Sequence, residues 1–318
     1  MTNAAVTQNR HHLELAWLED GIALAESLNF SKAAAARYVT QPAFSRRIQA
    51  LEAWVGVALF ERNRRGARLT QAGEVFFHQV PDLIRTLYAL RSETRDSVEQ
   101  RAPEVIMCAT HALSFTFIPD WLRKNSDISR DGAFQLVSAT LHACERMLTQ
   151  GGAQFLLCYH HPHMQLHLPT QKFMSISLGQ DRLIPYSIAI SGTRNARLSA
   201  DAPGGFPFLA YSADSGLGCI ISNTAPLHRL TRKMETVFTS DLAATLLALV
   251  KAGEGVAWLP HALAAESEKS GAICRAASHE EKWTIPLDIR LYRPATRLAQ
   301  GAEMLWDSVL VGHQASPP

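Results

Sequence analysis

The chain has little of what a membrane-spanning or secreted protein needs. Its 318 residues contain no run of 18 or more apolar residues, and the longest segment without Asp, Glu, Lys or Arg, residues 147–171, is interrupted by glycines, prolines and histidines. A bilayer span needs about 20 mostly apolar residues, so we expect none. Residues 1–12 are polar and lack the apolar core of a secretory signal. These absences predict a cytoplasmic protein.

Cysteines and catalytic motifs are also sparse. The cysteines are odd in number, lie far apart and form no CxxC pair, which favours reduced thiols over a disulfide framework or a zinc site. The sequence has no GxGxxG, P-loop, HExxH or GxSxG motif. We therefore expect no enzyme activity, no cofactor and no structural metal. The five cysteines are Cys108, Cys144, Cys158, Cys219 and Cys274.

What the chain does contain is an ordinary globular composition with one basic segment. Hydrophobic residues make up 47% and charged residues 19%, and the length predicts two or three compact units. The net charge is only +2, but eight basic residues and two acidic ones lie between Phe30 and Thr70. Such a block is typical of a surface that binds nucleic-acid phosphates, although a solvated basic surface stays open as an alternative. The charged residues are Lys32, Arg37, Arg46, Arg47, Arg62, Arg64, Arg65 and Arg68 against Glu52 and Glu61.

Two helices are predicted at the start of this region. Apolar residues recur at i, i+4 and i+7 from Leu18, which predicts an amphipathic helix over residues 15–27. Ser31 is a candidate N-cap for an alanine-rich helix over residues 32–39. Its small side chains would let another helix cross closely.

A third helix is predicted over residues 41–55. Thr40 is a candidate N-cap, Pro42 lies in the first turn, and Gly56 lies just past the end. One face of this helix is apolar and would be buried. That face carries Phe44, Ile48, Leu51 and Val55.

The opposite face of the third helix is rich in hydrogen-bonding groups. Two helices joined by a short turn, the second with such a face, match a helix-turn-helix that inserts its recognition helix into the major groove. Gln41 and Gln49 suit adenine edges, Arg46 suits guanine or phosphate, and Ser45 suits phosphate. Pro42 lies on the same face. We predict that these five residues contact DNA.

Residues 59–70 predict a β-hairpin wing. Two short apolar segments flank a turn that ends in Gly66, and the tip is basic. A wing beside a recognition helix would contact the backbone or the adjacent minor groove and would add affinity more than sequence information. The predicted contacts are Arg62, Arg64, Arg65 and Arg68.

About sixty contiguous residues of this region resemble the winged helix-turn-helix of the LysR-type transcriptional regulators. The motifs that carry the resemblance are Ala33-Ala34, Gln41-Pro42-Ala43-Phe44-Ser45, Ile48, Leu51-Glu52, Gly56, Leu59-Phe60-Glu61-Arg62, Leu69-Thr70 and Gly73. The resemblance implies a DNA-binding regulator. A generic three-helix core with a basic surface is the alternative.

A long helix is predicted from Thr70, where the LysR-type family has its dimerising linker helix. Its apolar residues recur with the 4,3,4,3 spacing of a two-stranded coiled coil. Pro81 departs from this pattern, so we expect a kink there or a helix that begins later. Residues 96–103 are polar, end in proline and predict a hinge. The predicted seam is Phe76, Val80, Leu83, Leu87 and Leu90.

The remainder alternates strands and helices and predicts an α/β domain with two similar halves. The first half has expected strands at 105–109, 134–139 and 154–159 and a helix at 141–150. The second half is expected to start at residues 182–185 and to continue with strands near 208–212 and 236–238, a turn at 216–218 into a helix, and a helix at 240–251.

Residues 240–260 resemble a second characteristic block of the family, within a periplasmic-binding-protein-like effector domain. The resemblance implies a ligand in the cleft between halves, near strand ends and helix N-termini. Ser114, Thr140 and Ser240 also fit a simple role as helix caps. The predicted effector-binding residues are Thr110, His111, Ser114, Thr140, His160, Ser212 and Ser240.

A metal site and an oxidant signal are two other chemistries that the residues of this domain suggest. His160, His161, His163 and His167 with Cys158 invite a metal site, but no familiar ligand spacing completes it, so we predict none.

An oxidant signal is the second chemistry. Cys108 and Cys158 lie near strand ends, and several blocks resemble the hypochlorite-responsive branch of the family, whose members respond through methionine oxidation. The corresponding cleft helices here offer Leu217 and Leu242 rather than methionine.

The sequence therefore predicts a LysR-type regulator with three segments. These are a winged helix-turn-helix at residues 1–72, a linker helix and hinge at 73–102, and a two-lobed effector domain at 103–318. The partners implied by the resemblance are double-stranded promoter DNA, a small-molecule or oxidant effector, RNA polymerase, and further copies of the chain in a homodimer or homotetramer. The alternative is a cytoplasmic small-molecule-binding module that regulates no promoter.

Overall fold

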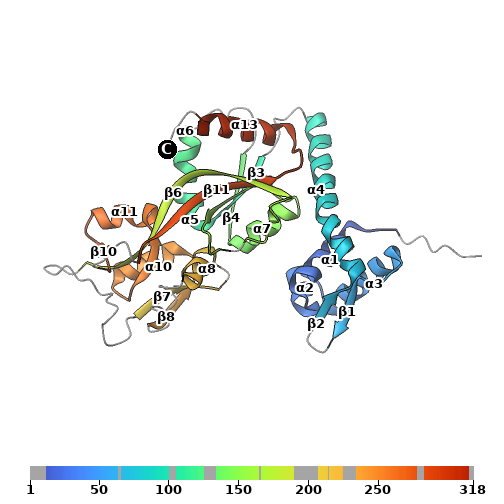
Figure 1. Ribbon diagram of the computed structural model, residues 1–318, viewed down its shortest axis with the longest axis horizontal. Helices are drawn as coiled ribbons and strands as arrows, with labels where there is room; N and C mark the ends of the chain where they lie inside the picture. The colour runs from blue at the N-terminus through green and yellow to red at the C-terminus, as the bar shows by residue number, and fades with distance from the viewer. Residues whose placement is uncertain are drawn as a thin grey trace, which may run out of the picture. The chain divides into compact units, whose positions relative to one another are not determined.

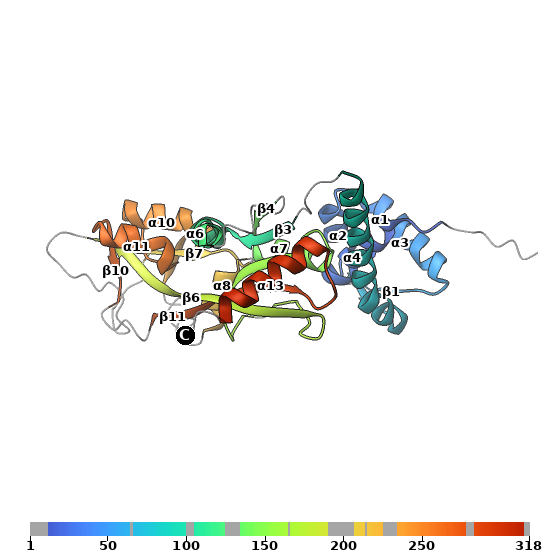
Figure 2. The same ribbon diagram turned by 90° about the horizontal axis from the view of Figure 1, so that it is seen from above.

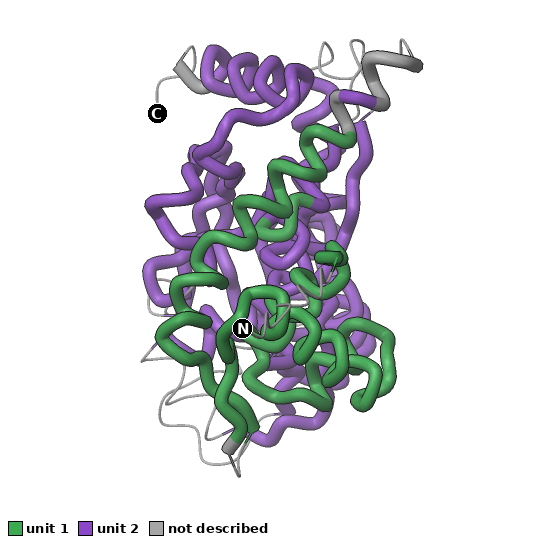
Figure 3. Tube along the Cα trace, turned by 90° about the vertical axis from the view of Figure 1, so that its right-hand side faces the viewer, with its two compact units in different colours: residues 1–91, 149–151 green, residues 92–148, 152–318 purple. Residues whose placement is uncertain are grey.

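The structure, a computed structural model, contains two compact units. The first comprises residues 1–91 with 149–151, and the second comprises residues 92–148 with 152–318 (Figure 3). Each unit has its own apolar core. The structure describes residues 12–63, 66–99, 105–124, 134–164, 166–189, 207–213, 215–224, 234–277 and 283–314.

The first unit is a helical head with a two-stranded wing and a long helix (Figure 1). The predicted helices at 15–27 and 41–55 and the predicted hairpin are confirmed. Phe44, Ile48 and Leu51 are buried in the core, as the helical spacing of apolar residues requires. The elements are α1 (Leu15–Ser27), α2 (Phe30–Ala36), α3 (Gln41–Val55), β1 (Phe60–Asn63), β2 (Gly66–Leu69) and α4 (Gln71–Glu99).

The second helix begins and ends earlier than predicted, and Ser31 is not its cap. Asn29 is the N-cap, and its Oδ1 accepts hydrogen bonds from the backbone N–H groups of Ser31 and Lys32, both at 3.0 Å. Helix α2 ends at Ala36, and Tyr38 follows with a left-handed φ of 55°. The alanine-rich run therefore stops before the turn that leads to α3.

Helix α4 starts at Gln71 and runs through Pro81, so the expectation of a later start is wrong. Proline removes one backbone donor but is tolerated where neighbouring packing holds the helix. The helix continues to Glu99, which covers the first part of the predicted hinge; residues 100–103 lie outside the described part of the chain.

The second unit is built on a mixed sheet. Among the described residues, seven strands form one sheet in the order β10-β6-β11-β5-β3-β4, with β9 also paired to β6. Strand β3 is parallel to β4 and β5, whereas β11 is antiparallel to β5 and β6. Strands β7 and β8 form a separate parallel pair.

The strands of this unit are β3 (Val105–Thr110), β4 (Phe134–Ala139), β5 (Phe155–His160), β6 (Phe173–Ile188), β7 (Pro207–Tyr211), β8 (Glu235–Ser240), β9 (Ala257–Pro260), β10 (Ile273–Arg275) and β11 (Ile285–Pro294). The helices are α5 (His111–Thr116), α6 (Ile118–Lys124), α7 (Leu141–Thr149), α8 (Gly216–Asn223), α10 (Ala243–Ala252), α11 (His261–Lys269) and α13 (Gln300–Gln314).

The two lobes of this unit share strand β6, which is 16 residues long. Residues 173–183 pair with β11, while residues 183–188 pair with β9 and β10 (Figure 1, Figure 2). The sequence predicted a second half starting at Arg182, which lies inside this strand. From Leu183 onward the strand does pair with the second lobe, as predicted. The earlier start of the strand at Phe173 was missed because residues 174–180 are only partly buried or exposed, so their sequence lacks a core strand's apolar pattern.

Candidate DNA interface and effector pocket

Helix α3 presents the predicted DNA-reading face to solvent. Gln41, Pro42, Arg46 and Gln49 are exposed, and Ser45 is half-buried. The helix ends at Gly56, whose left-handed φ of 86° suits glycine. Thr40 occupies the N-cap position, but among the described residues its side chain caps no helix N–H. Uncapped N–H groups at an exposed helix start suit a phosphate contact.

The wing is tied to α3 by Arg62. Its guanidinium donates a hydrogen bond to Ser45 Oγ at 2.6 Å and lies 4.3 Å from the centre of the Phe30 ring. Arg62 and Ser45, predicted as separate DNA contacts, therefore form one polar group between wing and helix.

The charge at the wing is smaller than the sequence suggested. Arg68 Nε donates to Glu61 Oε2 at 2.7 Å across the hairpin, which partly neutralises it. The predicted contacts Arg64 and Arg65 lie outside the described residues.

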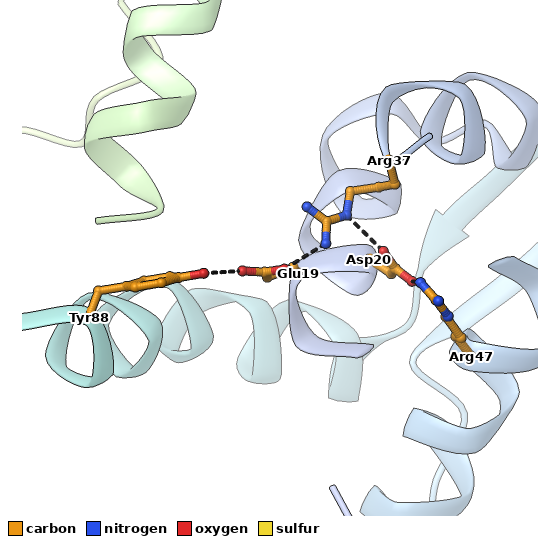
Figure 4. A network of polar contacts seen from close by, with 5 residues as sticks. All are labelled: Glu19, Asp20, Arg37, Arg47 and Tyr88. Carbon is orange, nitrogen blue, oxygen red and sulfur yellow. Dashed lines mark hydrogen bonds and ion pairs between the residues drawn. The ribbon is translucent and has the colours of Figure 1, made fainter. Parts of the chain in front are cut away.

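Two further arginines of the basic segment are paired with a buried carboxylate. Asp20 on α1 is fully buried, and its two oxygens accept from Arg37 Nε at 2.8 Å and Arg47 Nη1 at 3.2 Å (Figure 4). Arg37 also donates to Glu19 at 2.6 Å. Burial lowers the pKa of Arg37, but its hydrogen bonds with Asp20 and Glu19 outweigh this and raise it above the ordinary value.

The charge count from Phe30 to Thr70 missed this pairing because both carboxylates precede the counted segment. Arg47 and Arg37 hold the three helices together. In the part of the chain that the structure describes, Lys32 and Arg46 form no ion pair and remain available to phosphates.

The predicted seam of α4 divides into two faces. Val80 is buried in the head core, and Phe76 packs against that core. Leu83, Leu87 and Leu90 are 43–57% exposed and form an apolar stripe. The exposed apolar stripe of α4 is therefore shorter than the predicted seam.

The second unit contains a pocket with about 460 Å³ of empty space. Its walls come from the ends of β3, β4 and β5 and from the starts of α5, α7, α8 and α10. Strand ends and helix starts meet there, as expected for a ligand cleft in an α/β domain. The lining residues are Thr110, His111, Ala112, Ala139, Thr140, Leu141, Cys158, Tyr159, Ser215, Gly216, Leu217, Asp241 and Ala243.

Three predicted effector residues, Thr110, His111 and Thr140, line this pocket. Two others lie outside the described lining and have protein partners. Ser114 Oγ donates to the carbonyl of His111 at 2.7 Å. His160 Nδ1 lies 2.9 Å from Tyr292 Oη on the neighbouring strand.

Ser212 and Ser240 also lie outside the described lining of the pocket. Ser240 was predicted to start a helix, and that prediction was wrong. It is the last residue of β8, and its carbonyl accepts a hydrogen bond from the Ser212 N–H at 3.0 Å. Its side chain accepts from the Leu242 N–H at 3.1 Å, and α10 begins after Leu242. A polar Ser-Asp pair before an apolar run imitates a helix cap, which explains the error.

Three helix N-termini open on the pocket. Leu141, Gly216 and Ala243 are the first residues of α7, α8 and α10, and all three line it. The N-terminus of a helix carries partial positive charge and favours an anion. Among the described residues, the buried Thr110 Oγ1 has no hydrogen-bond partner. A buried hydroxyl without a partner is one that a ligand can satisfy.

Three polar residues of the lining were not predicted as effector contacts. Ser215 caps α8, and its Oγ accepts from the Gly218 N–H at 3.5 Å. Asp241 is exposed at the rim, and Tyr159 donates to Asp181 at 2.7 Å. The serine before the predicted 216–218 turn was a recognisable cap signal. Nothing local marks the other two residues.

The thiols and methionine positions bear on the oxidant hypothesis. Cys108 and Cys158 are fully buried. A hydrogen bond with Cys144 and burial raise the pKa of Cys108, and burial raises the pKa of Cys158. Thiols react as thiolates, so these environments oppose reaction at neutral pH. Leu217 lines the pocket.

Metal-binding clusters and membrane-spanning helices are both absent from the part of the chain that the structure describes. No group of three His, Cys, Asp or Glu side chains in these ranges lies close enough together to hold a metal ion. None of the described helices combines the length and apolar composition of a membrane span.

A winged helix-turn-helix joined to a two-lobed domain with a pocket defines a ligand-responsive DNA-binding regulator. Residues 15–74 match the family described as bacterial regulatory helix-turn-helix protein, lysR family, and residues 99–310 match the LysR substrate binding domain. The chain belongs to the LysR family of transcriptional regulators. Its second unit is accordingly the family's periplasmic-binding-like effector domain.

Several known proteins are similar over nearly the whole chain. The HTH-type transcriptional regulator YjiE of Escherichia coli (strain K12) is 29% identical over 296 residues, which cover 93% of this chain and 94% of the relative. Full-length HypT from Salmonella typhimurium, a hypochlorite-specific LysR-type transcriptional regulator, is 30% identical with a TM-score of 0.56. The match covers 96% of this chain and 100% of the HypT chain. Vibrio fischeri DarR in complex with DNA is 26% identical with a TM-score of 0.54. The match covers 94% of this chain and 98% of the DarR chain.

Proposed function

We propose that this LysR-type regulator responds to a small organic anion that also carries a hydrogen-bond donor. The observation that carries the proposal is the unpartnered Thr110 hydroxyl in a pocket where three helix N-termini open. Asp241 at the rim favours a donor on the other end of the ligand. A carboxylate with an amino or hydroxyl group combines these features.

The DNA-facing residues follow from exposure and charge. Gln41, Arg46 and Gln49 read base edges or phosphates in the major groove, and the wing contacts the backbone. The protein works in the cytoplasm as a homodimer or homotetramer and acts on RNA polymerase at its promoter. The exposed stripe of α4 supports self-association through this helix.

An oxidant signal, suggested by the similarity to HypT, is the second candidate. The buried thiols with raised pKa values and Leu217 in the pocket wall favour the organic anion instead. Treatment of the protein with hypochlorite is therefore expected to leave specific DNA binding unchanged.

The test is a thermal-shift screen of the full chain against hydroxy- and amino-carboxylates, with sulfate and phosphate as inorganic arms. Thr110→Val removes a hydroxyl that has no partner, so the free protein should be as stable as wild type or more stable. Its affinity for a binding acid should fall about tenfold, or roughly 1.4 kcal/mol. Thr236→Val, an exposed position of β8 outside the described lining, is the matched control. Equal affinity of wild type and Thr110→Val, or a response to hypochlorite alone, would reject the anion proposal.

A further inference from the structure

A continuous set of polar contacts connects the linker helix with the recognition helix. Tyr88 on α4 donates from its hydroxyl to Glu19 Oε1 on α1 at 2.6 Å, which raises the pKa of the tyrosine (Figure 4). Glu19 Oε2 accepts from Arg37 at 2.6 Å, and Arg37 shares the buried Asp20 with Arg47 of α3. The contacts therefore pass from α4 through α1 and the end of α2 to α3.

Tyr88 lies on the C-terminal side of Pro81 in helix α4. Pro81 has no N–H to donate, so one backbone hydrogen bond is missing inside the helix. Val80 and Ile84 hold the helix to the head core on the two sides of Pro81. Tyr88 follows Ile84 by four residues, about 6 Å along the helix axis. It extends the attachment by one turn past Ile84.

The opposite face of the same segment carries Leu83, Leu87 and Leu90, the exposed stripe on which a second copy would pack. The direction of this segment then sets the distance between the two heads of a dimer. Heads held at a fixed distance accept one spacing of DNA half-sites.

We propose that Tyr88 and Glu19 are positioning residues that fix the linker helix beyond Pro81 against the head and thereby determine the half-site spacing that the dimer accepts. This inference rests on the dimer of the proposed function. Neither residue touches DNA; both act through the direction of α4.

In the first experiment, a duplex that binds the wild-type chain is selected from a random library. One or two base pairs are then inserted between the half-sites of that duplex. Wild type should lose about tenfold in affinity per altered spacer, whereas Tyr88→Phe should lose less than about threefold. Binding to a single half-site should be the same for both proteins. The matched control is Tyr186→Phe, which removes a hydroxyl hydrogen-bonded to Glu268 in the second unit and should keep the wild-type spacer penalty. If Tyr88→Phe loses as much affinity as wild type when base pairs are inserted between the half-sites, the proposal is overturned.

The second experiment measures hydrogen exchange and does not depend on DNA. Tyr88→Phe should speed exchange of the α4 amides at residues 82–91 by about tenfold and leave α3 unchanged. In a Pro81→Ala background, which restores the missing donor, the same substitution should have a smaller effect. Unchanged exchange at residues 82–91 refutes the anchor whatever the DNA result. A wild-type chain that selects no duplex refutes the proposed function instead, and the exchange data still decide the role of Tyr88.

Discussion

Arg46 and Arg47 are neighbours on α3, yet the structure predicts opposite consequences of removing them. Arg46 is exposed and, within the described residues, forms no ion pair, whereas Arg47 donates to the buried Asp20. Arg46→Ala should therefore weaken DNA binding and leave the head stable. Arg47→Ala should destabilise the head and leave the phosphate contacts of the folded protein nearly intact.

The magnitudes follow from the partners. A hydrogen bond to a charged group contributes about 1.5–3 kcal/mol. Because the Arg47 side chain is 38% exposed and solvent screens it, we use the low end, about 1.5 kcal/mol. Asp20 keeps Arg37 as a partner, so the head still folds. Replacing the exposed Arg46 should change stability by less than about 0.5 kcal/mol, while one lost phosphate contact should lower the salt slope of binding by about one unit.

The assays use the full chain. Hydrogen exchange of α3 peptides should accelerate about tenfold in Arg47→Ala, as a loss of about 1.5 kcal/mol requires, and stay unchanged in Arg46→Ala. Fluorescence anisotropy on duplex DNA across a salt series should show the reduced slope only in Arg46→Ala. If Arg47→Ala lowers the slope by one unit and leaves exchange unchanged, Arg47 is a DNA contact and the assignment to Asp20 is refuted.

Two further predictions concern the effector domain. Gly218→Ala would place a Cβ 2.6 Å from the carbonyl oxygen of Ser212, so thermal unfolding should show a loss of about 1–3 kcal/mol; an unchanged midpoint would mean that α8 shifts freely. The hydrogen bond with Arg293 lowers the pKa of Glu303 below its ordinary 4.5, so the pair stabilises the fold above that pH, and the stabilisation is lost as pH falls through the lowered value. The midpoints of wild type and Glu303→Gln should differ at pH 7 and converge towards pH 3; a constant difference would show that ionisation plays no part.

Local patterns in the sequence predicted the local structure well. The spacing from Leu18 gave α1, and Thr40, Pro42 and Gly56 gave the bounds of α3, because caps and apolar periodicity act over a few residues. Strand β4 coincides with the predicted 134–139.

Features that depend on contacts far apart in the chain could not be read in this way. Asp20 is an ordinary acidic residue in the sequence, and only the fold brings Arg37 and Arg47 to it from 17 and 27 residues away. The same holds for the pocket. Thr110 and Thr140 were found because they follow strands, whereas Tyr159 reaches the pocket from inside a buried strand.

The shared strands of the effector domain constrain how the protein can be made. Strand β5 pairs with β11 through Tyr159 and Ile289, which are 130 residues apart, and β6 also needs β11. On the ribosome, the head has its complete sequence early and can fold while synthesis continues. The first lobe must wait until β11 has emerged, and until then its central strands stay unpaired on one edge. The effector domain is therefore the part of the nascent chain that most needs protection from aggregation.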